Sequence, residues 1–260
     1  MSKIKPPFGS LPIWTPERQD MALDLAILGP NDLRDYSKPN PPIAGTNNGA
    51  TPVITEHGPA LSFDGVSNVN LPEISTASTE NVTIHFRAKV YEDALDNYGM
   101  VFGLLPSATN YIWLRTNQYF RIKLNDGETY NWNETVIKLG LLEMTDYTIV
   151  LSNTDQIISL YTNGVFFSSK ALTAPSAFNI NSIGSSYAAN NFSLDGEVVL
   201  VKIFNWALSA PEIKQVSDNP WQDWRKDNIL WMAAAQGGGT PATGSVNLLD
   251  GLFKRKRLIA

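Results

Sequence analysis

The sequence contains no cysteine, which excludes disulfides, thiolate chemistry and cysteine-held metal centres. It has only two histidines, His57 and His85, and their wide separation argues against a zinc site. Charged residues make up 17% of the chain and the net charge is -5, so the basic excess of a general nucleic-acid binder is missing. With 260 residues, the chain is long enough to bury a core without disulfide support.

Long apolar runs are also missing, since none approaches the roughly 18 residues that a membrane-spanning helix needs. The opening segment, "MSKIKPPFGSLPIW", lacks the apolar stretch of a secretory signal. We therefore expect no membrane partner, and we expect folding inside a cell with release by lysis, as for virion proteins. The N-x-Ser/Thr triplets at Asn81, Asn133 and Asn191 are then expected to be chance matches.

Short alternating segments are what the sequence does contain. Apolar and polar residues alternate in 81–90, "NVTIHFRAKV", and again in "YIWLR" (111–115) and "YFRIKL" (119–124). Asn163-Gly164 separates two apolar runs and predicts a tight β-hairpin, because both turn positions favour positive φ. Residues 197–205, "EVVLVKIFN", are apolar without alternation, as in a strand that is covered on both faces.

One helix is predicted after Leu208, where Ser209 and Glu212 have the spacing of a capping box and Pro211 fits the first turn. It is expected to end before residues 218–220. Residues 29–60 hold many Pro, Asn and Gly and predict a long loop. The whole pattern predicts an all-β, antiparallel two-sheet sandwich of about a dozen strands with one short C-terminal helix.

Composition divides the chain into three parts. Residues 1–20, rich in Pro and polar groups, predict an extended N-terminal arm, and residues 21–218 predict a single sandwich domain. Residues 219–260 predict an extended C-terminal segment, with a flexible Gly-rich linker, "GGGTPATGS", before a basic and apolar end, "LLDGLFKRKRLIA".

Two segments resemble a known family. "GPALSFDGVSNVNLP" (58–72) and "LDGEVVLVKIFNWALSAPEI" (194–213) resemble an early strand pair and the closing signature of LamG-like jelly rolls, in the concanavalin A-like lectin/glucanase family. The hairpin in "DYTIVLSNTDQIISLYTNGVFFSS" (146–169) is similar to theirs, and the resemblance covers roughly 21–217. It implies a jelly-roll sandwich. The short helix followed by "NPW" and a basic end resembles LamG-like proteins of bacteriophage virions.

The resemblance also raises the question of calcium. The family often has acidic residues in its closing strand, where this chain has Val199 and Leu200. Asp35, Asp64 and Asp195 lie near the family's turns and are the candidates for a structural calcium, which takes six to eight oxygen ligands. We predict no metal-ligand set and no required cofactor, and we keep a structural calcium as an open alternative.

The same sandwich serves β-glucanases and some polysaccharide lyases, so the resemblance leaves an enzyme as an alternative. The glucanase pattern Glu-x-Asp-x-x-Glu and the lyase pattern Gln-x-His are both missing from the sequence. Glu92 and Asp93 are adjacent and would point to opposite faces of a strand. We therefore predict no catalytic residues and a non-enzymatic protein, with a divergent hydrolase or lyase as the less favoured alternative.

A carbohydrate-binding face is the leading site hypothesis. If the alternating strands are neighbours, their aromatic rings can stack on sugars and their arginines can bind carboxylates or sulfates. The competing interpretation is ordinary core filling and sheet decoration. Lys123 shares a face with two of the candidates. The candidate residues are Tyr111, Trp113, Arg115, Tyr119, Arg121, Trp132, His85 and Arg87.

The terminal segments suggest assembly. Basic and apolar groups there could dock on an acidic partner surface, and the basic run is too short to predict a nucleic-acid partner. The candidate assembly residues are Trp221, Trp224, Trp231, Phe253, Lys254, Arg255, Lys256 and Arg257.

The sequence therefore favours a structural protein of a phage particle: a capsid decoration, a fibre or a tail accessory. We expect it in the virion, bound to other capsid or tail proteins through its arms, and as a homo-oligomer. Its lectin-like domain would bind host or environmental glycans. The alternative is a bacterial carbohydrate-binding module.

Overall fold

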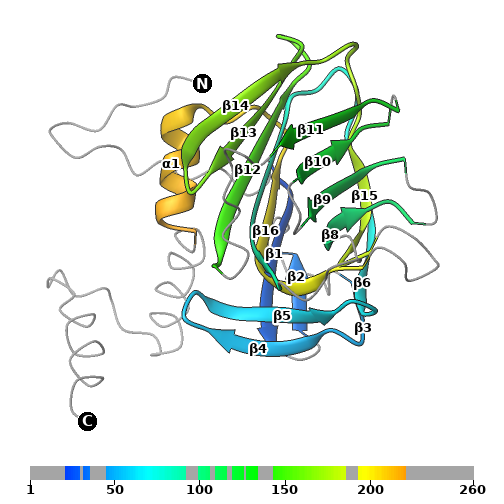
Figure 1. Ribbon diagram of the computed structural model, residues 1–260, viewed down its shortest axis with the longest axis vertical. Coiled ribbons are helices and arrows are strands. Elements are labelled where there is room, and N and C mark those ends of the chain that lie inside the picture. Colours follow the sequence, from blue (N-terminus) through cyan, green and yellow to red (C-terminus); the bar gives the residue numbers. More distant parts are fainter. Residues whose placement is uncertain are drawn as a thin grey trace, which may run out of the picture. The chain divides into compact units, whose positions relative to one another are not determined.

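Two antiparallel sheets lie face to face in the computed structural model and form a jelly-roll sandwich (Figure 1). The predicted all-β class with one short helix is confirmed. The structure describes residues 21–29, 32–35, 45–91, 99–105, 109–115, 119–125, 127–133, 143–185 and 193–220.

The larger sheet, sheet A, has nine strands. Its main path runs through β14 (Val165–Ala171), β13 (Ile157–Thr162), β12 (Thr145–Ser152), β7 (Val82–Val90), β16 (Asp195–Phe204), β1 (Met21–Gly29) and β2 (Asp32–Asp35). Beside that path, β5 (Gly58–Asp64) pairs with β16, and β4 (Thr51–Thr55) pairs with β5.

Sheet B has seven strands and faces sheet A across the core (Figure 1). Its order is β11 (Thr129–Asn133), β10 (Tyr119–Lys123), β9 (Tyr111–Arg115), β8 (Gly99–Gly103), β15 (Asn179–Ile183), β6 (Asn68–Ser75) and β3 (Thr46–Asn48). The two strands predicted at 111–115 and 119–124 are present, and they are antiparallel neighbours, which is the condition on which the site hypothesis depended.

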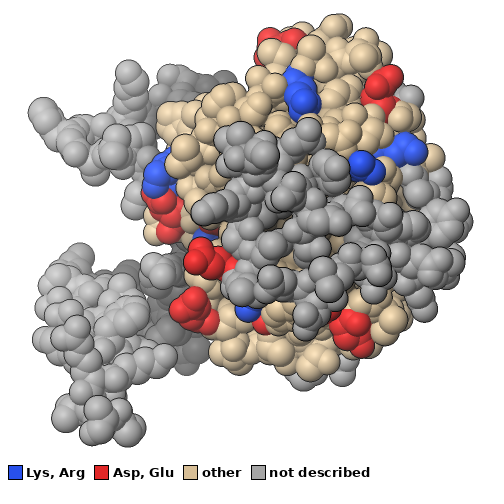
Figure 2. All heavy atoms as spheres, viewed as in Figure 1, with Lys and Arg blue, Asp and Glu red and all other residues tan. Residues whose placement is uncertain are grey.

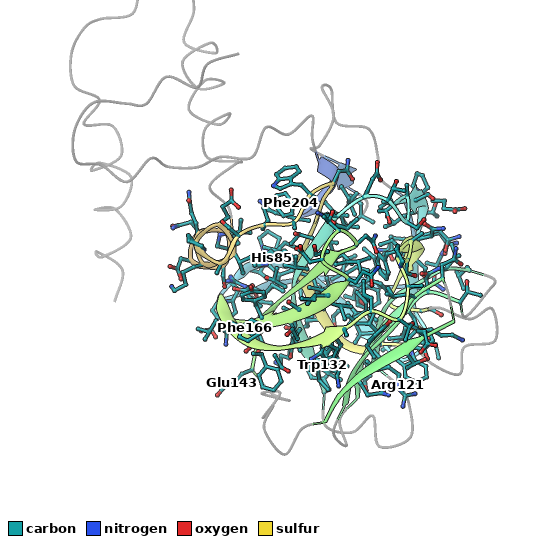
Figure 3. The ribbon with its side chains drawn as sticks, turned by 90° about the horizontal axis from the view of Figure 1, so that it is seen from above. His85, Arg121, Trp132, Glu143, Phe166 and Phe204 are labelled. Atoms are coloured by element: carbon teal, nitrogen blue, oxygen red, sulfur yellow. The ribbon has the colours of Figure 1, made fainter. Side chains whose placement is uncertain are left out.

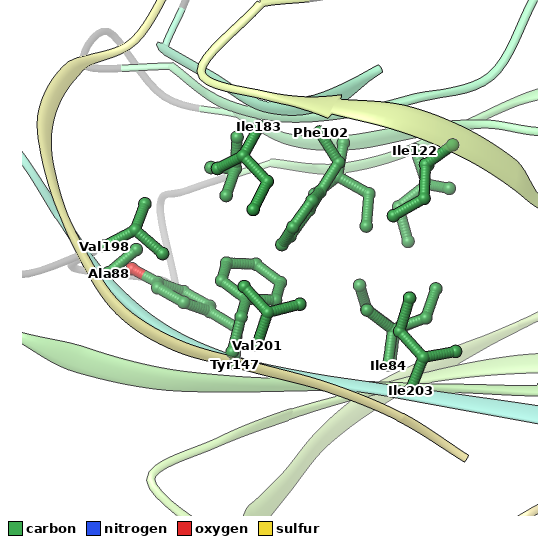
Figure 4. Packing of buried hydrophobic residues seen from close by; sticks show 14 of the residues in the cluster. Ile84, Ala88, Phe102, Ile122, Tyr147, Ile183, Val198, Val201 and Ile203 are labelled. Carbon is green, nitrogen blue, oxygen red and sulfur yellow. The ribbon is translucent and has the colours of Figure 1, made fainter. Parts of the chain in front are cut away.

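The core between the sheets is made of alternate strand residues that point inward. In Figure 4, Phe102, Ile122 and Ile183 of sheet B meet Ile84, Val201 and others of sheet A. Aromatic rings connect the layers by direct contact, and the contacts run in the order Trp132, Phe120, Tyr147, Phe86, Phe102.

The helix α1 (Ala210–Asp218) packs on the outward side of sheet A (Figure 1). The Glu212 carboxylate accepts hydrogen bonds from the backbone N–H and the hydroxyl of Ser209, both at 2.7 Å. Ile213 and Val216 bury the apolar side of the helix in a second, smaller cluster with Phe204 of β16. This cluster explains why β16 is apolar on both faces, since one face meets the core and the other meets α1.

The predicted turn at Asn163-Gly164 is confirmed, with φ of 50° and 75° at the two residues. The predicted long loop over 29–60 is wrong in part, because β2, β3, β4 and the start of β5 lie within it. These strands are short, and their Pro and Asn residues are tolerated because they lie at sheet edges or next to turns. No helix in the described ranges is long and apolar enough to cross a membrane.

Candidate functional site

The outward side of sheet B carries the clearest concentration of site residues. In β9, β10 and β11 the inward positions, such as Ile112 and Phe120, enter the core, so the alternate positions face outward. Cross-strand pairing arranges those outward positions in rows. One row is Tyr111, Lys123 and Thr129; the next is Trp113, Arg121 and Asn131.

Aromatic and cationic side chains are in contact within these rows. The rings of Tyr111 and Trp113 stack with centroids 4.4 Å apart and an interplanar angle of 17°. The Arg121 guanidinium lies 5.1 Å from the centroid of the Trp113 ring, and Lys123 Nζ lies 6.0 Å from that of Tyr111. Both cations therefore lie over aromatic rings, as in cation–π contacts.

A hydrogen bond also orients Arg121, the cation of the second row. Arg121 Nε donates to Asn131 Oδ1 at 2.6 Å, so a neutral amide orients the guanidinium. Trp113, Arg121 and Lys123 are half-buried, whereas Tyr111 is only 7% exposed. Figure 2 shows basic side chains on the side of the molecule where β9 to β11 lie in Figure 1.

Of the eight candidate residues, Tyr111, Trp113 and Arg121 are brought together here. Arg115 and Tyr119 continue the same register, paired with each other, and their side chains lie outside the described residues. Asn131 and Thr129 were missed by sequence reasoning. The alternation in "TYNWN" places them opposite the cations once β11 is known to pair with β10.

Trp132 does not rim this face as predicted. It is 3% exposed and lies in the core, where its ring contacts Phe120 at 5.7 Å, edge to face. The reason is strand parity: Trp132 alternates with Asn131, so the two point to opposite sides of sheet B.

His85 and Arg87 do not belong to this face either. They lie on β7 of sheet A and point outward from the other layer, beneath α1 (Figure 3). Figure 3 shows His85 near the helix and Arg121 on the far side of the sandwich. The prediction grouped them because alternation identifies the polar face of each strand but does not say which sheet the strand joins.

The residues under α1 form a buried polar cluster. Arg87 donates from Nε and Nη2 to the two oxygens of Asp146 at 2.7 and 2.6 Å, and the Ser217 hydroxyl also donates to Asp146, at 2.8 Å. His85 has no exposed surface, and its Nδ1 lies 2.8 Å from the Thr148 hydroxyl oxygen. Burial lowers the pKa of His85 to about 4, outweighing the opposite effect of Asp146. The cluster ties α1 to sheet A.

Thr148, His85 and Asp146 include the residue types of a nucleophile–base–acid relay. They lack the access that catalysis needs, since none of the three is more than 4% exposed. The relay geometry also fails: His85 Nε2 is 3.9 Å from Asp146 Oδ1, and both Asp146 oxygens already accept from Arg87. The cluster is therefore structural.

The calcium candidates are only partly brought together. Asp64 and Asp195 face each other across β5 and β16. Asp64 Oδ1 accepts from the N–H groups of Val66 and Ser67, which lowers the pKa of Asp64 and commits that oxygen to a turn. No group of three or more metal-binding side chains occurs within the described ranges. The Asp35 side chain and all the predicted assembly residues, from Trp221 to Arg257, lie outside those ranges.

An antiparallel jelly roll with an aromatic and basic outward face defines the class, a lectin-like β-sandwich. The family comparison agrees: residues 63–214 match the model of the concanavalin A-like lectin/glucanases superfamily, in its Laminin_G_3 branch. The chain belongs to this superfamily, as the sequence resemblance predicted. A search of curated proteins finds no match.

Solved structures share the fold at low sequence identity. The binding domain of Paraclostridial Mosquitocidal Protein 1 is 17% identical (TM-score 0.58), with 79% of this chain and 53% of that chain covered. The botulinum neurotoxin serotype D ligand binding domain, in complex with N-acetylneuraminic acid, is also 17% identical (TM-score 0.57), covering 78% and 51%. Domain 4 of AbnA, a GH43 extracellular arabinanase from Geobacillus stearothermophilus, in complex with arabinotriose, is 18% identical (TM-score 0.55), covering 76% and 98%.

The chain therefore spans about half the length of the two toxin domains and nearly all of the arabinanase domain. At these identities the similarity establishes the fold alone. Two of these neighbours are binding domains, and the third is a domain in complex with arabinotriose.

Proposed function

We propose that the protein is a non-enzymatic glycan-binding domain, and that the outward side of β9, β10 and β11 holds the sugar. The observation that carries the proposal is the stacked pair Tyr111 and Trp113 with Arg121 and Lys123 over its rings. Aromatic surfaces bind the apolar faces of sugars, and guanidinium groups bind their polar or anionic substituents. The lectin-like family and the sugar complexes of two structural neighbours support the proposal.

The test is a glycan array probed with the full chain and with Trp113→Ala. We expect the variant to lose about tenfold in affinity, the order of one stacking contact with a desolvated ring. Phe166→Ala is the matched control, because Phe166 is an exposed aromatic residue on sheet A. Binding that survives Trp113→Ala unchanged, or that Phe166→Ala reduces equally, contradicts this location.

We propose further that a phage particle carries this domain, as a capsid decoration, fibre or tail accessory, in homo-oligomeric form. The support is the resemblance of the short helix, "NPW" and basic end to LamG-like virion proteins. Particle incorporation would use the aromatic and basic residues of 221–257. The test is mass spectrometry of purified particles with immunogold labelling, comparing the full chain with a deletion of 219–260. Absence of the full chain from particles, or unchanged incorporation of the deletion, contradicts this part.

A bacterial carbohydrate-binding module is the second candidate. One observation favours it: this fold covers 98% of an arabinanase domain that was solved with a bound arabinose oligosaccharide. The particle experiment separates the two candidates, since a bacterial module would be missing from particles and would retain glycan binding.

A further inference from the structure

We infer that the bound glycan presents an uncharged sugar unit to the hydroxyls of Ser182 and Ser193, on the β15 side of the outward face of sheet B. This inference rests on the proposed function and adds the chemical class of the ligand at a second part of that face. It comes from two buried hydroxyl groups that no protein group satisfies within the described residues.

Ser182 shares a row with Tyr111 on the outward side of sheet B. β8 lies between β9 and β15 (Figure 1), and its Gly103 pairs with Tyr111 on one side and with Ser182 on the other. The row continues to Asn70 of β6, which is exposed, so Ser182 also points outward. Because Gly103 has no side chain, β8 adds none between the serine and the ring, whose backbones are about 10 Å apart.

Ser193 shares the next row with Trp113. Met100 of β8 pairs with Trp113 and forms an isolated bridge with Ser193. The residue that follows Ser193, Leu194, belongs to the core, so the Ser193 side chain points away from the core. Each ring of the aromatic stack therefore has a serine opposite it across β8.

Both serine hydroxyls are buried and unsatisfied. Ser182 is 0% exposed and Ser193 is 1% exposed, and neither Oγ has a hydrogen-bond partner in the part of the chain that the structure describes. Ser152 on sheet A shows the usual case, since it is buried and its hydroxyl donates to Asp155 at 2.8 Å. A buried hydroxyl without a partner loses its bonds to water and gains none in return. Two such groups in adjacent rows indicate a bound molecule that supplies the bonds.

The chemistry on this side of the face fits an uncharged ligand. A serine hydroxyl both donates and accepts, which matches the capacity of a sugar hydroxyl. A carboxylate or sulfate only accepts, and its burial is costly unless a charged partner is present. The described row neighbours of the two serines are uncharged: Gly103, Asn70 and Met100. The serines therefore favour a sugar unit with free hydroxyls.

The face becomes deeper from β9 toward β15. Trp113 is half-buried, Tyr111 is 7% exposed, and both serines are buried. A glycan can therefore stack on Trp113 at the accessible side and extend its next unit across β8 to the serines. The ring contact supplies affinity, whereas the hydroxyls select among sugars, because a ligand that leaves them unpaired is penalised.

The binding experiment uses the full chain in isothermal titration calorimetry. The uncharged probes are cellotetraose, maltotetraose, xylotetraose and mannotetraose, and the acidic probe is tetragalacturonate, which has a carboxylate on every unit. We expect at least one uncharged probe to bind at least about tenfold more tightly than tetragalacturonate, because the acidic probe must bury a carboxylate beside uncharged groups.

Two variants locate the effect. Ser182→Ala and Ser193→Ala each remove one hydroxyl, and each should weaken binding of the uncharged probe about three- to tenfold, the order of one neutral hydrogen bond. The melting temperature of the free chain should stay the same or rise, because an unpaired buried hydroxyl is removed. Ser152→Ala is the matched control: its hydroxyl has a partner on sheet A, so this variant should lower the melting temperature and leave sugar binding unchanged.

The outcomes separate the inference from the proposed function. If Trp113→Ala weakens binding but both serine variants bind as the unmodified chain does, the serines hold water only; this overturns the inference and leaves glycan binding intact. Tighter binding of tetragalacturonate than of every uncharged probe has the same consequence. A lower melting temperature in both serine variants, or an equal loss of binding in Ser152→Ala, overturns the role of the two hydroxyls. Binding of none of the probes overturns the inference, whereas a hit elsewhere on the glycan array still supports the function.

Discussion

His85 shows how surroundings set the role of a single residue. It lies fully buried between Thr148, Lys202 and Asp146 on sheet A, and its pKa is lowered to about 4 chiefly because burial desolvates the imidazolium. Arg87 and Lys202, both positive, lower it further, and Asp146 acts in the opposite direction. At neutral pH His85 is therefore uncharged and serves as a packed polar residue that holds the region below α1.

This pKa makes stability depend on pH. The unfolded chain, with a histidine pKa near 6.5, binds a proton in the window from about 6.5 to 4, and the folded chain does not. The contribution to stability is therefore fully present above pH 6.5 and is lost as pH falls toward 4. We expect the free energy of unfolding, measured by urea denaturation, to decrease by a few kcal/mol across that window.

The His85→Asn variant isolates the effect, because the amide nitrogen or oxygen can still meet Thr148 but does not titrate near neutral pH. Its unfolding free energy should depend less on pH between 6.5 and 4 than that of the unmodified chain. His57→Asn is the control for losing any histidine, since His57 lies in the turn between β4 and β5. A pH dependence that His85→Asn leaves unchanged contradicts the assignment.

At the scale of elements, the β13–β14 hairpin and α1 support each other. Asn163 at the turn exchanges hydrogen bonds with Asp146: its backbone N–H donates to the Asp146 carbonyl at 2.9 Å, and its Oδ1 accepts from the Asp146 N–H at 3.0 Å. Asp146 in turn accepts from the hydroxyl of Ser217 in α1. The turn is therefore a structural junction between β12, the hairpin and the helix.

Gly164→Ala tests this junction. Gly164 has φ of 75°, and a Cβ there would lie 3.0 Å from Lys214 Cδ and 3.1 Å from Ser217 Cβ, so it would press against α1. We expect a loss of about 1–3 kcal/mol in unfolding free energy, measured by thermal or chemical denaturation. Gly127→Ala is the matched control, because Gly127 has φ of 88° with no atom within 4 Å of the added Cβ. If both variants lose the same amount of unfolding free energy, the contact of the added Cβ with α1 contributes nothing to the loss.

At the scale of the whole molecule, the last strand organises sheet A. β16 pairs with β7 along one side, and with β5 and then β1 along the other. Val198, Val201 and Ile203 of β16 enter the core, and Phe204 meets α1. The N-terminal strand β1 therefore gains its place in the sheet only when residues 195–204 are present.

A chain that ends at Ser193 should consequently fail to fold. It lacks β16, so β1 and β5 lose their shared neighbour and the core loses one wall. We expect no near-ultraviolet circular dichroism and no cooperative thermal transition from this truncation. A chain that ends at Pro220 is the control and should keep both signals, because it retains every strand and α1. Cooperative unfolding of the shorter chain would contradict the central role of β16.

Much of the fold could be predicted from local sequence. The alternation in 82–90, 111–115 and 119–123, and the Asn163-Gly164 turn, are properties of neighbouring residues, and all four predictions are confirmed. The short strands inside 29–60 could not be found this way. Their pairing energy comes from partners distant in the sequence, such as β2 on β1 and β3 on β6.

The candidate site residues also fall into two groups: those that local sequence identifies and those whose position depends on distant strand pairing. Tyr111, Trp113 and Arg121 were identified together because β9 and β10 are adjacent in sequence and in space. His85 and Arg87 were assigned to the same surface wrongly, since their sheet is fixed by pairing with β12 and β16. Trp132 was assigned to the wrong side of sheet B, because neighbouring positions in a strand point to opposite sides.

The sequence by itself determined the alternating strands, the hairpin, the helix cap and the family, because each depends on residues that are close together along the chain. Only the tertiary structure decided which polar faces share a surface and which charges neutralise one another. The register between strands far apart in sequence gives every cation of β7 and β16 an acidic neighbour across a strand pair. The physical reason is that pairing across strands, and not position along the chain, sets the partners of each charge.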